Sequence, residues 1–169
     1  MPGDVIASIN AGGNDFNDSI YTILDPTRTA AVAAQVRANI AEMIRLLRER
    51  YEGPAAGKSV LVMVHNLHDP TDGTGRIPAG FDDGFCGTIQ HPLFTDGLRA
   101  QALANLGTMN VEIAAAAADG GAVLVDVHSG FMGHGMNGGS ERWLSGDCTH
   151  PTDDGHHHLR RIAWEAISP

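Results

Sequence analysis

Aromatic side chains, positive charges and long apolar runs are all scarce in this sequence. Aromatics make up 5% of the 169 residues against 43% apolar residues overall, so we expect a core built from Ala, Val, Ile and Leu. No run of about 18 apolar residues occurs, and therefore no membrane span is predicted. Only 11 Lys and Arg oppose 20 Asp and Glu. The resulting net charge of −9 would repel phosphate backbones, which argues against a nucleic-acid partner.

Cysteine is also rare, with only Cys86 and Cys148 in the chain. Neither has the close-spaced partner that a zinc site needs. Two interpretations stay open: a disulfide, which would pin the loop around Cys86 beside Asp147, or two unrelated thiols. We favour the disulfide, which would imply an oxidising compartment and a secreted or periplasmic protein. The segment Met1–Asp4 lacks the basic and apolar regions of a signal peptide.

Hydrophobic patterning predicts strands and helices in alternation. Short continuous apolar runs are typical of buried parallel strands, and apolar residues recurring every three or four positions are typical of helices. The predicted strands are Asp4–Ile9, Ser59–Val64 and Ala122–Val127, and the predicted helices are about Pro26–Tyr51, Asp96–Asp119 and Asp154–Ile167. This order indicates an α/β domain with a parallel sheet, whose chemistry lies beyond the carboxyl ends of the strands. The segment 65–94 is predicted to be a long irregular loop, typical of a lid or binding wall.

Two polar motifs are expected at that edge of the sheet. Gly12-Gly13-Asn14-Asp15 follows the first strand, where glycines allow close backbone approach and Asn14 can point an N–H into a cleft. Asp147-Cys148-Thr149-His150-Pro151 precedes the last helix, and an aspartate at this spacing can orient an imidazole that acts as a general base. Taken alone, each motif also fits an ordinary turn or helix cap.

In this order, and with the second motif continuing to Gly155, the chain resembles the SGNH hydrolases, the GDSL esterases and lipases. Val125-Asp126-Val127 and Gly130-Phe131 are similar to that family's last strand and the loop after it. The resemblance covers 1–169 as one domain. It implies a three-layer, doubly wound parallel sheet of the flavodoxin-like type, and hydrolysis of a small-molecule, carbohydrate or lipid ester with no cofactor and no metal.

The resemblance also implies residue roles. His150 would be the general base, Asp147 its orienting partner and Asn14 an oxyanion donor, with Gly12, Gly13 and Asp15 supporting the turn. The family pairs these groups with a serine in a Gly-Asp-Ser motif, which occurs nowhere in this sequence. That serine follows the family's first strand, and its glycine oxyanion donor follows the second.

Because both of those strands precede the Gly-x-Asn-Asp strand in the family, we expect the sheet here to lack them. The strand Asp4–Ile9 would then be a bare edge that pairs with an N-terminal segment or with another copy of the chain. Five serines were weighed as substitutes for the nucleophile. Ser8 is expected to be buried in the first strand, Ser129 at the end of the third strand is the best placed, and Ser19, Ser140 and Ser145 fit capping or turn roles better. The alternative function is a catalytically inactive SGNH-like binding or assembly module.

Nine histidines invite a metal interpretation, which the spacing does not favour. His156–His158 would face three directions from a helix and so cannot chelate one ion together. A zinc site from His65, His68 and His91 has no further support in the sequence. Asp69–Gly73 lacks the downstream glutamate of a calcium loop. We expect solvated loop at His65, His68 and His91 and at Asp69–Gly73.

Overall fold

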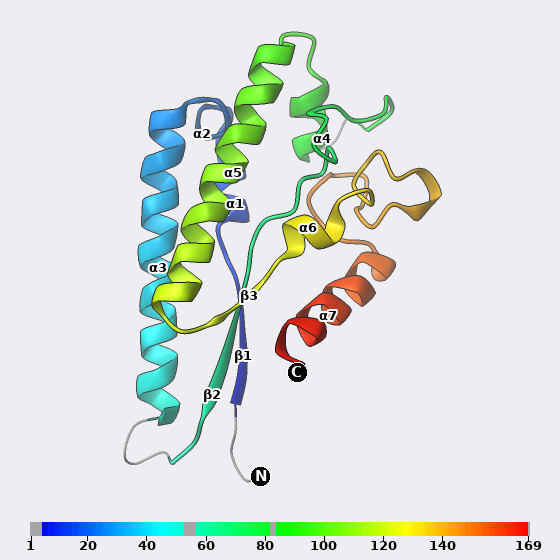
Figure 1. Cartoon of the computed structure of the whole chain (residues 1–169). Coiled ribbons are helices and arrows are strands. Elements are labelled where there is room, and N and C mark those ends of the chain that lie inside the picture. Colours follow the sequence, from blue (N-terminus) through cyan, green and yellow to red (C-terminus); the bar gives the residue numbers. More distant parts are fainter. Residues whose placement is uncertain (1–4, 53–56, 82–83, 169) are drawn as a thin grey trace.

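The computed structural model describes residues 5–52, 57–81 and 84–168, and within them three strands form a parallel sheet. The strands are β1 (Val5–Asn10), β2 (Val60–His65) and β3 (Val123–Val125), in the order β1-β2-β3 (Figure 1). Val5 lies opposite Val60, and Met63 lies opposite Val123. The predicted α/β class with a parallel sheet is confirmed. Asp4, the expected start of the first strand, lies outside the described residues.

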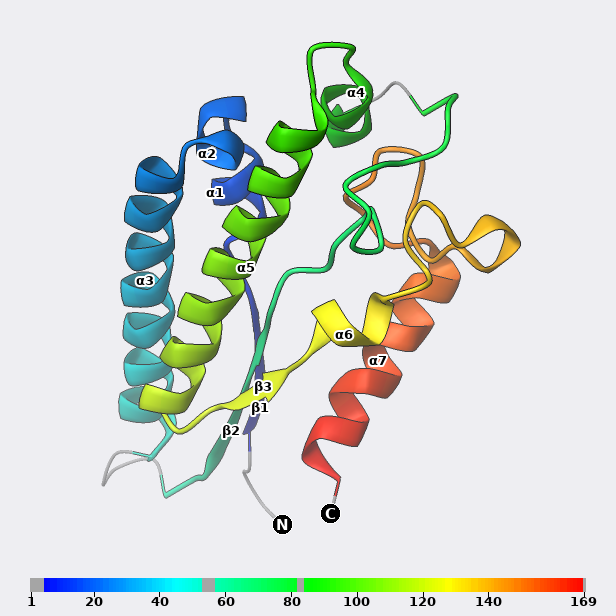
Figure 2. The same ribbon diagram turned by 45° about the horizontal axis from the view of Figure 1, so that its top comes forward.

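Two long helices cover one face of the sheet. They are α3 (Pro26–Glu52) and α5 (Asp96–Asp119), which run side by side in both views (Figures 1 and 2). Their apolar faces meet β1 and β2 in a core that includes Ile9, Val36, Ile40, Ile44, Val62, Val64, Met109 and Ile113. The predicted bounds of α5 are confirmed, and α3 runs one residue beyond the expected Tyr51. Within the described residues, no helix is long and apolar enough to cross a membrane.

The opposite face carries α6 (Val127–Phe131) and α7 (Asp153–Ile167). A second core forms there, in which Phe131 packs edge-on against Trp143. The Trp143 ring is itself stacked between His134 and His158, with both ring centroids 3.6 Å away. Helices on both faces complete the expected three-layer arrangement.

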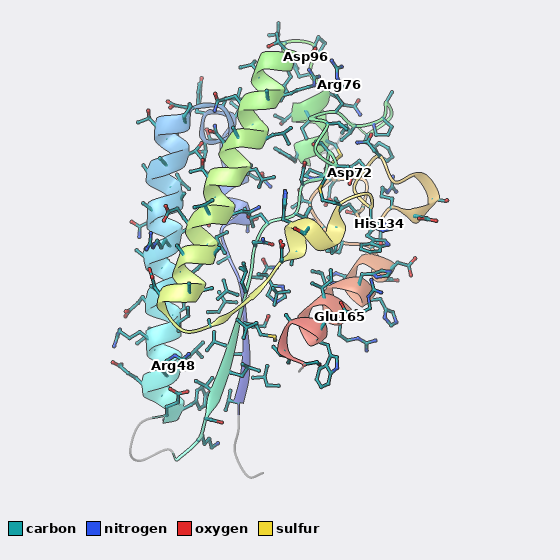
Figure 3. All side chains as sticks on the ribbon, viewed as in Figure 1. Arg48, Asp72, Arg76, Asp96, His134 and Glu165 are labelled. Atoms are coloured by element: carbon teal, nitrogen blue, oxygen red, sulfur yellow. A yellow bond between two sulfur atoms is a disulfide. The ribbon has the colours of Figure 1, made fainter. Side chains whose placement is uncertain are left out.

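Short helices and turns form the carboxyl edge of the sheet. They are α1 (Gly13–Asn17), α2 (Ile20–Leu24), α4 (Gly84–Gln90) and the 3-10 turn η1 (Gly139–Glu141). The Asp72 carboxylate joins two of the loops, because it accepts hydrogen bonds from the backbone N–H of Gly133 (3.0 Å) and Gly135 (2.8 Å). Asp72 and His134 label these neighbouring loops in Figure 3.

Three expectations about local structure were wrong. The segment 65–94 is not wholly irregular, because it contains α4. The third strand is shorter than predicted, because the Asp126 side chain accepts the N–H of Ser129 and turns the chain into α6. Ser129 therefore lies within α6 rather than at a strand end. The expected helix stop at Gly53-Pro54 lies outside the described residues.

The outer edge of β1 has no strand partner within the described residues. Ile6, 60% exposed, and its neighbour across the strands Leu61, 37% exposed, lie on the part of the sheet that α7 leaves uncovered. Ser8 is on this same face. It is exposed rather than buried as expected, and its Oγ lies 2.9 Å from His65 Nε2.

Candidate active site

Asp147 and His150 form a hydrogen-bonded pair in the loop before α7. His150 Nδ1 lies 2.6 Å from Asp147 Oδ2. The loop is closed by an antiparallel bridge between Leu144 and Pro151 and by the Ser145 N–H, which donates to the His150 carbonyl at 2.8 Å. The His150 side chain is 76% exposed, so its outer nitrogen, Nε2, is accessible.

The Asp147 carboxylate is held by further donors on its other oxygen. Oδ1 accepts the Ser145 hydroxyl at 2.6 Å and the backbone N–H groups of Thr149 (2.9 Å) and His150 (3.0 Å). Partial burial by itself would raise the pKa of Asp147, but these hydrogen bonds and the imidazole together lower that pKa well below its ordinary value. An ionised Asp147 requires a donor from His150, so we assign the proton to Nδ1. Nε2 is then left as an acceptor.

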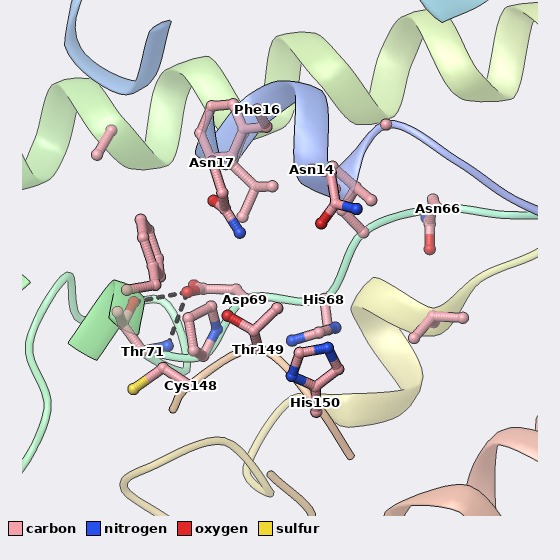
Figure 4. A pocket seen from close by; sticks show the side chains of 18 of the residues that line it. Asn14, Phe16, Asn17, Asn66, His68, Asp69, Thr71, Cys148, Thr149 and His150 are labelled. Atoms are coloured by element: carbon pink, nitrogen blue, oxygen red, sulfur yellow. Dashed lines mark hydrogen bonds between the residues drawn. The ribbon is translucent and has the colours of Figure 1, made fainter. Parts of the chain in front are cut away.

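Asn14 is presented from the opposite wall by α1. The helix begins after Gly12, whose φ of +101° favours glycine, and a Cβ there would lie 3.1 Å from Val36 Cγ1. The Asn14 side chain is exposed and points toward the side of the cavity that carries His150 (Figure 4). It makes no hydrogen bond within 5–52, 57–81 and 84–168, which leaves its amide free to bind another group.

A cavity of about 440 Å³ lies between these two walls, lined by both Asn14 and His150. Asn17 and Thr149 also line the cavity, although no sequence pattern predicts a role for them, and His68, considered above as a possible metal ligand, lines it as well. All three lie around the same space in Figure 4. His68 could have been identified as a site residue from its position just after β2, at the carboxyl edge of the sheet. Burial lowers the pKa of His68, which favours the neutral imidazole.

The predicted disulfide between Cys86 and Cys148 is confirmed, with the two Cα atoms 5.3 Å apart. It joins α4 to the residue two positions before His150. Because both cysteines are buried, the bridge fixes one wall of the cavity relative to the Asp147–His150 pair.

None of the five serine hydroxyls hydrogen-bonds to the His150 imidazole within the part of the chain that the structure describes. Ser145 is bound to Asp147, and Ser19 caps α2 by accepting the N–H of Tyr21. Ser129 donates its N–H to Asp126. Only Ser8 is bonded to an imidazole, that of His65. In these same residues no three His, Cys, Asp or Glu side chains are grouped so that they could hold a metal ion.

The chain belongs to the GDSL-like lipase/acylhydrolase family, whose model matches residues 2–158. This is a family of ester hydrolases. The resemblance inferred from the Gly12–Asp15 and Asp147–His150 motifs is therefore confirmed.

Solved structures of two Streptomyces enzymes share the fold. Phospholipase A1 from Streptomyces albidoflavus NA297 matches 98% of this chain and 72% of its own, with a TM-score of 0.65 and 19% identity. An extracellular lipase from Streptomyces rimosus matches 96% of this chain and 69% of its own, with a TM-score of 0.55 and 22% identity. No curated protein matches the chain.

Proposed function

We propose that this chain is an ester hydrolase in which His150 is the general base and Asp147 its orienting partner. The observation that carries the proposal is the 2.6 Å Asp147–His150 contact on one wall of a cavity whose other wall presents Asn14. A serine oxygen attacks the ester carbonyl while Nε2 of His150 takes its proton, and Asp147 stabilises the imidazolium. The imidazolium then protonates the leaving alcohol. Water hydrolyses the acyl-enzyme with His150 again acting as base.

Asn14 is proposed as an oxyanion donor. Its side-chain N–H would bind the carbonyl oxygen as negative charge develops there, and loss of one such donor typically costs about 2.7–4 kcal/mol of barrier. Gly12 and Gly13 set the turn that brings Asn14 to the cavity. Asp15 is exposed on α1 and is proposed to support this turn rather than to take part in chemistry.

The nucleophile is proposed to come from a strand that completes the sheet at the outer edge of β1. In this proposal 1–169 is one SGNH-type domain, and the added strand comes from an N-terminal segment or, failing that, from a second copy of the chain. The support is the unpaired β1 edge together with the exposed Ile6 and Leu61 beside it.

Intact mass and light scattering test this completion of the sheet. We expect either a co-purifying segment or a particle larger than the 17.8 kDa chain, and we expect Ile6→Lys to weaken the association. A monodisperse monomer of 17.8 kDa with no added peptide would contradict edge pairing.

A catalytically inactive SGNH-like binding module is the second candidate. It is favoured by one observation, that no serine hydroxyl within the described residues bonds to His150. Such a module would keep the cavity and the Asp147–His150 pair but would not turn over an ester.

Hydrolysis of p-nitrophenyl acetate by wild type, His150→Ala and His157→Ala separates the two candidates. His157 is an exposed histidine on α7 away from Asn14 and His150, so its variant controls for nonspecific imidazole reactivity. We expect activity in wild type and His157→Ala and its loss in His150→Ala. Activity that survives His150→Ala removes this residue from the mechanism. No activity in any of the three favours the binding module only where the sample already contains the added strand, because the chain without that strand would lack its nucleophile. In an active sample, fluorophosphonate labelling followed by peptide mass spectrometry identifies the attacking serine.

A further inference from the structure

One peptide group beside the Asp147 carboxylate, the one that joins Cys148 to Thr149, is held at both of its ends. Its N–H donates to Asp147 Oδ1 at 2.9 Å. Its carbonyl oxygen accepts a hydrogen bond from the imidazole of His68. The N–H of Cys148 is already bound to the Ser145 carbonyl at 3.2 Å, so the carbonyl is the group of the Cys148 backbone that His68 contacts. His68 and Asp147 therefore fix the same peptide group from opposite ends.

The backbone conformation of Cys148 needs this support. Its φ of +62° lies in the left-handed region, which residues other than glycine rarely adopt and which persists where the surrounding structure holds it. The turn brings the N–H groups of Thr149 and His150 onto a single oxygen, Asp147 Oδ1. The disulfide holds Cys148 by its side chain, and His68 holds it by its backbone.

The His68 imidazole is itself held in a fixed position. Asn110 of α5 binds the backbone of the preceding residue, Leu67, by accepting its N–H (2.8 Å) and donating to its carbonyl (2.9 Å). The following residue, Asp69, accepts the N–H and the hydroxyl of Thr71 at 2.8 and 2.7 Å (Figure 4). Burial lowers the pKa of His68, so the neutral ring carries one N–H as its donor.

We propose that His68 is a positioning residue for His150 and acts through the peptide group that joins Cys148 to Thr149. The functional meaning of this inference rests on the proposed role of His150 as the base, but its test does not. Without the His68 donor the Cys148 carbonyl loses its partner, and the left-handed turn opens more often. Asp147 then holds the His150 imidazole for a smaller fraction of the time.

Amide hydrogen exchange measured by NMR tests the proposal. His68→Phe keeps a ring at this position but removes the donor. Exchange of the Thr149 and His150 amides should become about two- to tenfold faster, which is the effect of one ordinary hydrogen bond on an equilibrium. The Gly155 amide, which donates to the cap of α7, should exchange as in wild type. Nitrogen chemical shifts of the His150 imidazole should show a smaller share of the Nδ1–H tautomer.

Two amide variants test whether the donor or the packing of His68 is responsible. An asparagine places an N–H near the position of Nδ1 and a glutamine places one near Nε2, so either His68→Asn or His68→Gln should restore slow exchange. A role in packing alone would not be restored by either amide. His157→Phe is the matched control, because His157 is exposed on α7 and does not line the cavity that holds His150. It should exchange like wild type.

Three outcomes would each overturn the proposal: unchanged exchange of the Thr149 and His150 amides in His68→Phe, equal acceleration in His157→Phe, or acceleration that neither amide variant reverses. If His68→Phe does not fold, His68→Ala removes the donor without adding bulk and takes its place in the same comparison. Acceleration and rescue in a sample that contains the added strand but hydrolyses no ester would instead refute only the proposed hydrolysis.

Discussion

Removal of the Cys86–Cys148 disulfide should lower stability by several kcal/mol. The two cysteines are 62 residues apart in sequence. A cross-link over that distance reduces the entropy of the unfolded chain by about 14 cal/mol/K, which is about 4 kcal/mol at 25 °C. The replacement Cys86→Ala/Cys148→Ala avoids leaving a single reactive thiol. Both positions are buried, so the lost packing adds to the entropic cost rather than offsetting it.

Thermal unfolding followed by circular dichroism measures this loss. For a domain of this size, 1 kcal/mol corresponds to roughly 2–4 °C in Tm, so we expect a fall of about 8–16 °C in the double variant. Wild type unfolded in the presence of dithiothreitol should show a similar fall. The double variant should have the same Tm with and without the reductant, which serves as the internal control.

Two results would refute the reasoning. Two titratable thiols in the denatured, unreduced wild type would show that the bridge is absent. An intact bridge whose removal shifts Tm by less than about 2 °C would show that the bridge does not reduce the entropy of the unfolded chain by the expected amount. In that case the disulfide would serve only to hold α4 against the His150 loop.

Four further predictions concern substitutions at single positions. Asp147→Asn should lower kcat by several orders of magnitude, as steady-state ester hydrolysis would show, because an amide cannot hold the Nδ1–H tautomer in the same way. His68→Gln should flatten the pH dependence of unfolding free energy below about pH 6.5, measured by urea titration. Burial lowers the pKa of His68, so the unfolded chain takes up the proton first and wild type loses up to about 1.4 kcal/mol per pH unit on acidification. Gly155→Ala should destabilise by about 1–3 kcal/mol, since a Cβ would lie 2.1 Å from the Trp143 carbonyl oxygen. Gly107→Ala, in open space on α5, should stabilise by about 0.5–1 kcal/mol in the same thermal melts.

The main elements of the fold could be predicted because their signals are local. The α5 bounds Asp96–Asp119 follow from an N-cap at Thr95, which accepts the Leu98 N–H, and from Gly120 at the other end. The position of α3 could be predicted from apolar residues that recur every three or four positions. The α/β class followed from the alternation of such segments, which leaves few arrangements other than a parallel sheet with helices on its faces.

The errors occurred where tertiary contacts decide the conformation. Helix α4 has only seven residues, and the bond between Cys86 and Cys148, although expected, does not determine the backbone conformation around Cys86. Ser8 was expected to be buried because it lies in an apolar strand. It is exposed because α7 covers the β3 side of the sheet and leaves that face of β1 open. The residue pattern of a strand shows which side chains share a face of the sheet, but it does not show which face the helices cover.

The same distinction explains why the proposed reacting groups could be found from sequence and the apolar lining of the cavity could not. The bonds that hold Asp147 all come from residues 145–150, so a six-residue segment contains its own geometry. Gly12 and Gly155 mark close backbone approaches, at Val36 and at the Trp143 carbonyl, that other residues would obstruct. The apolar side chains that line the cavity, in contrast, come from α1, α4, α5 and the segment after β2, and none of them is unusual for a core. A motif can therefore indicate the chemistry of an ester hydrolase, while the shape of its cavity depends on packing between segments distant in sequence.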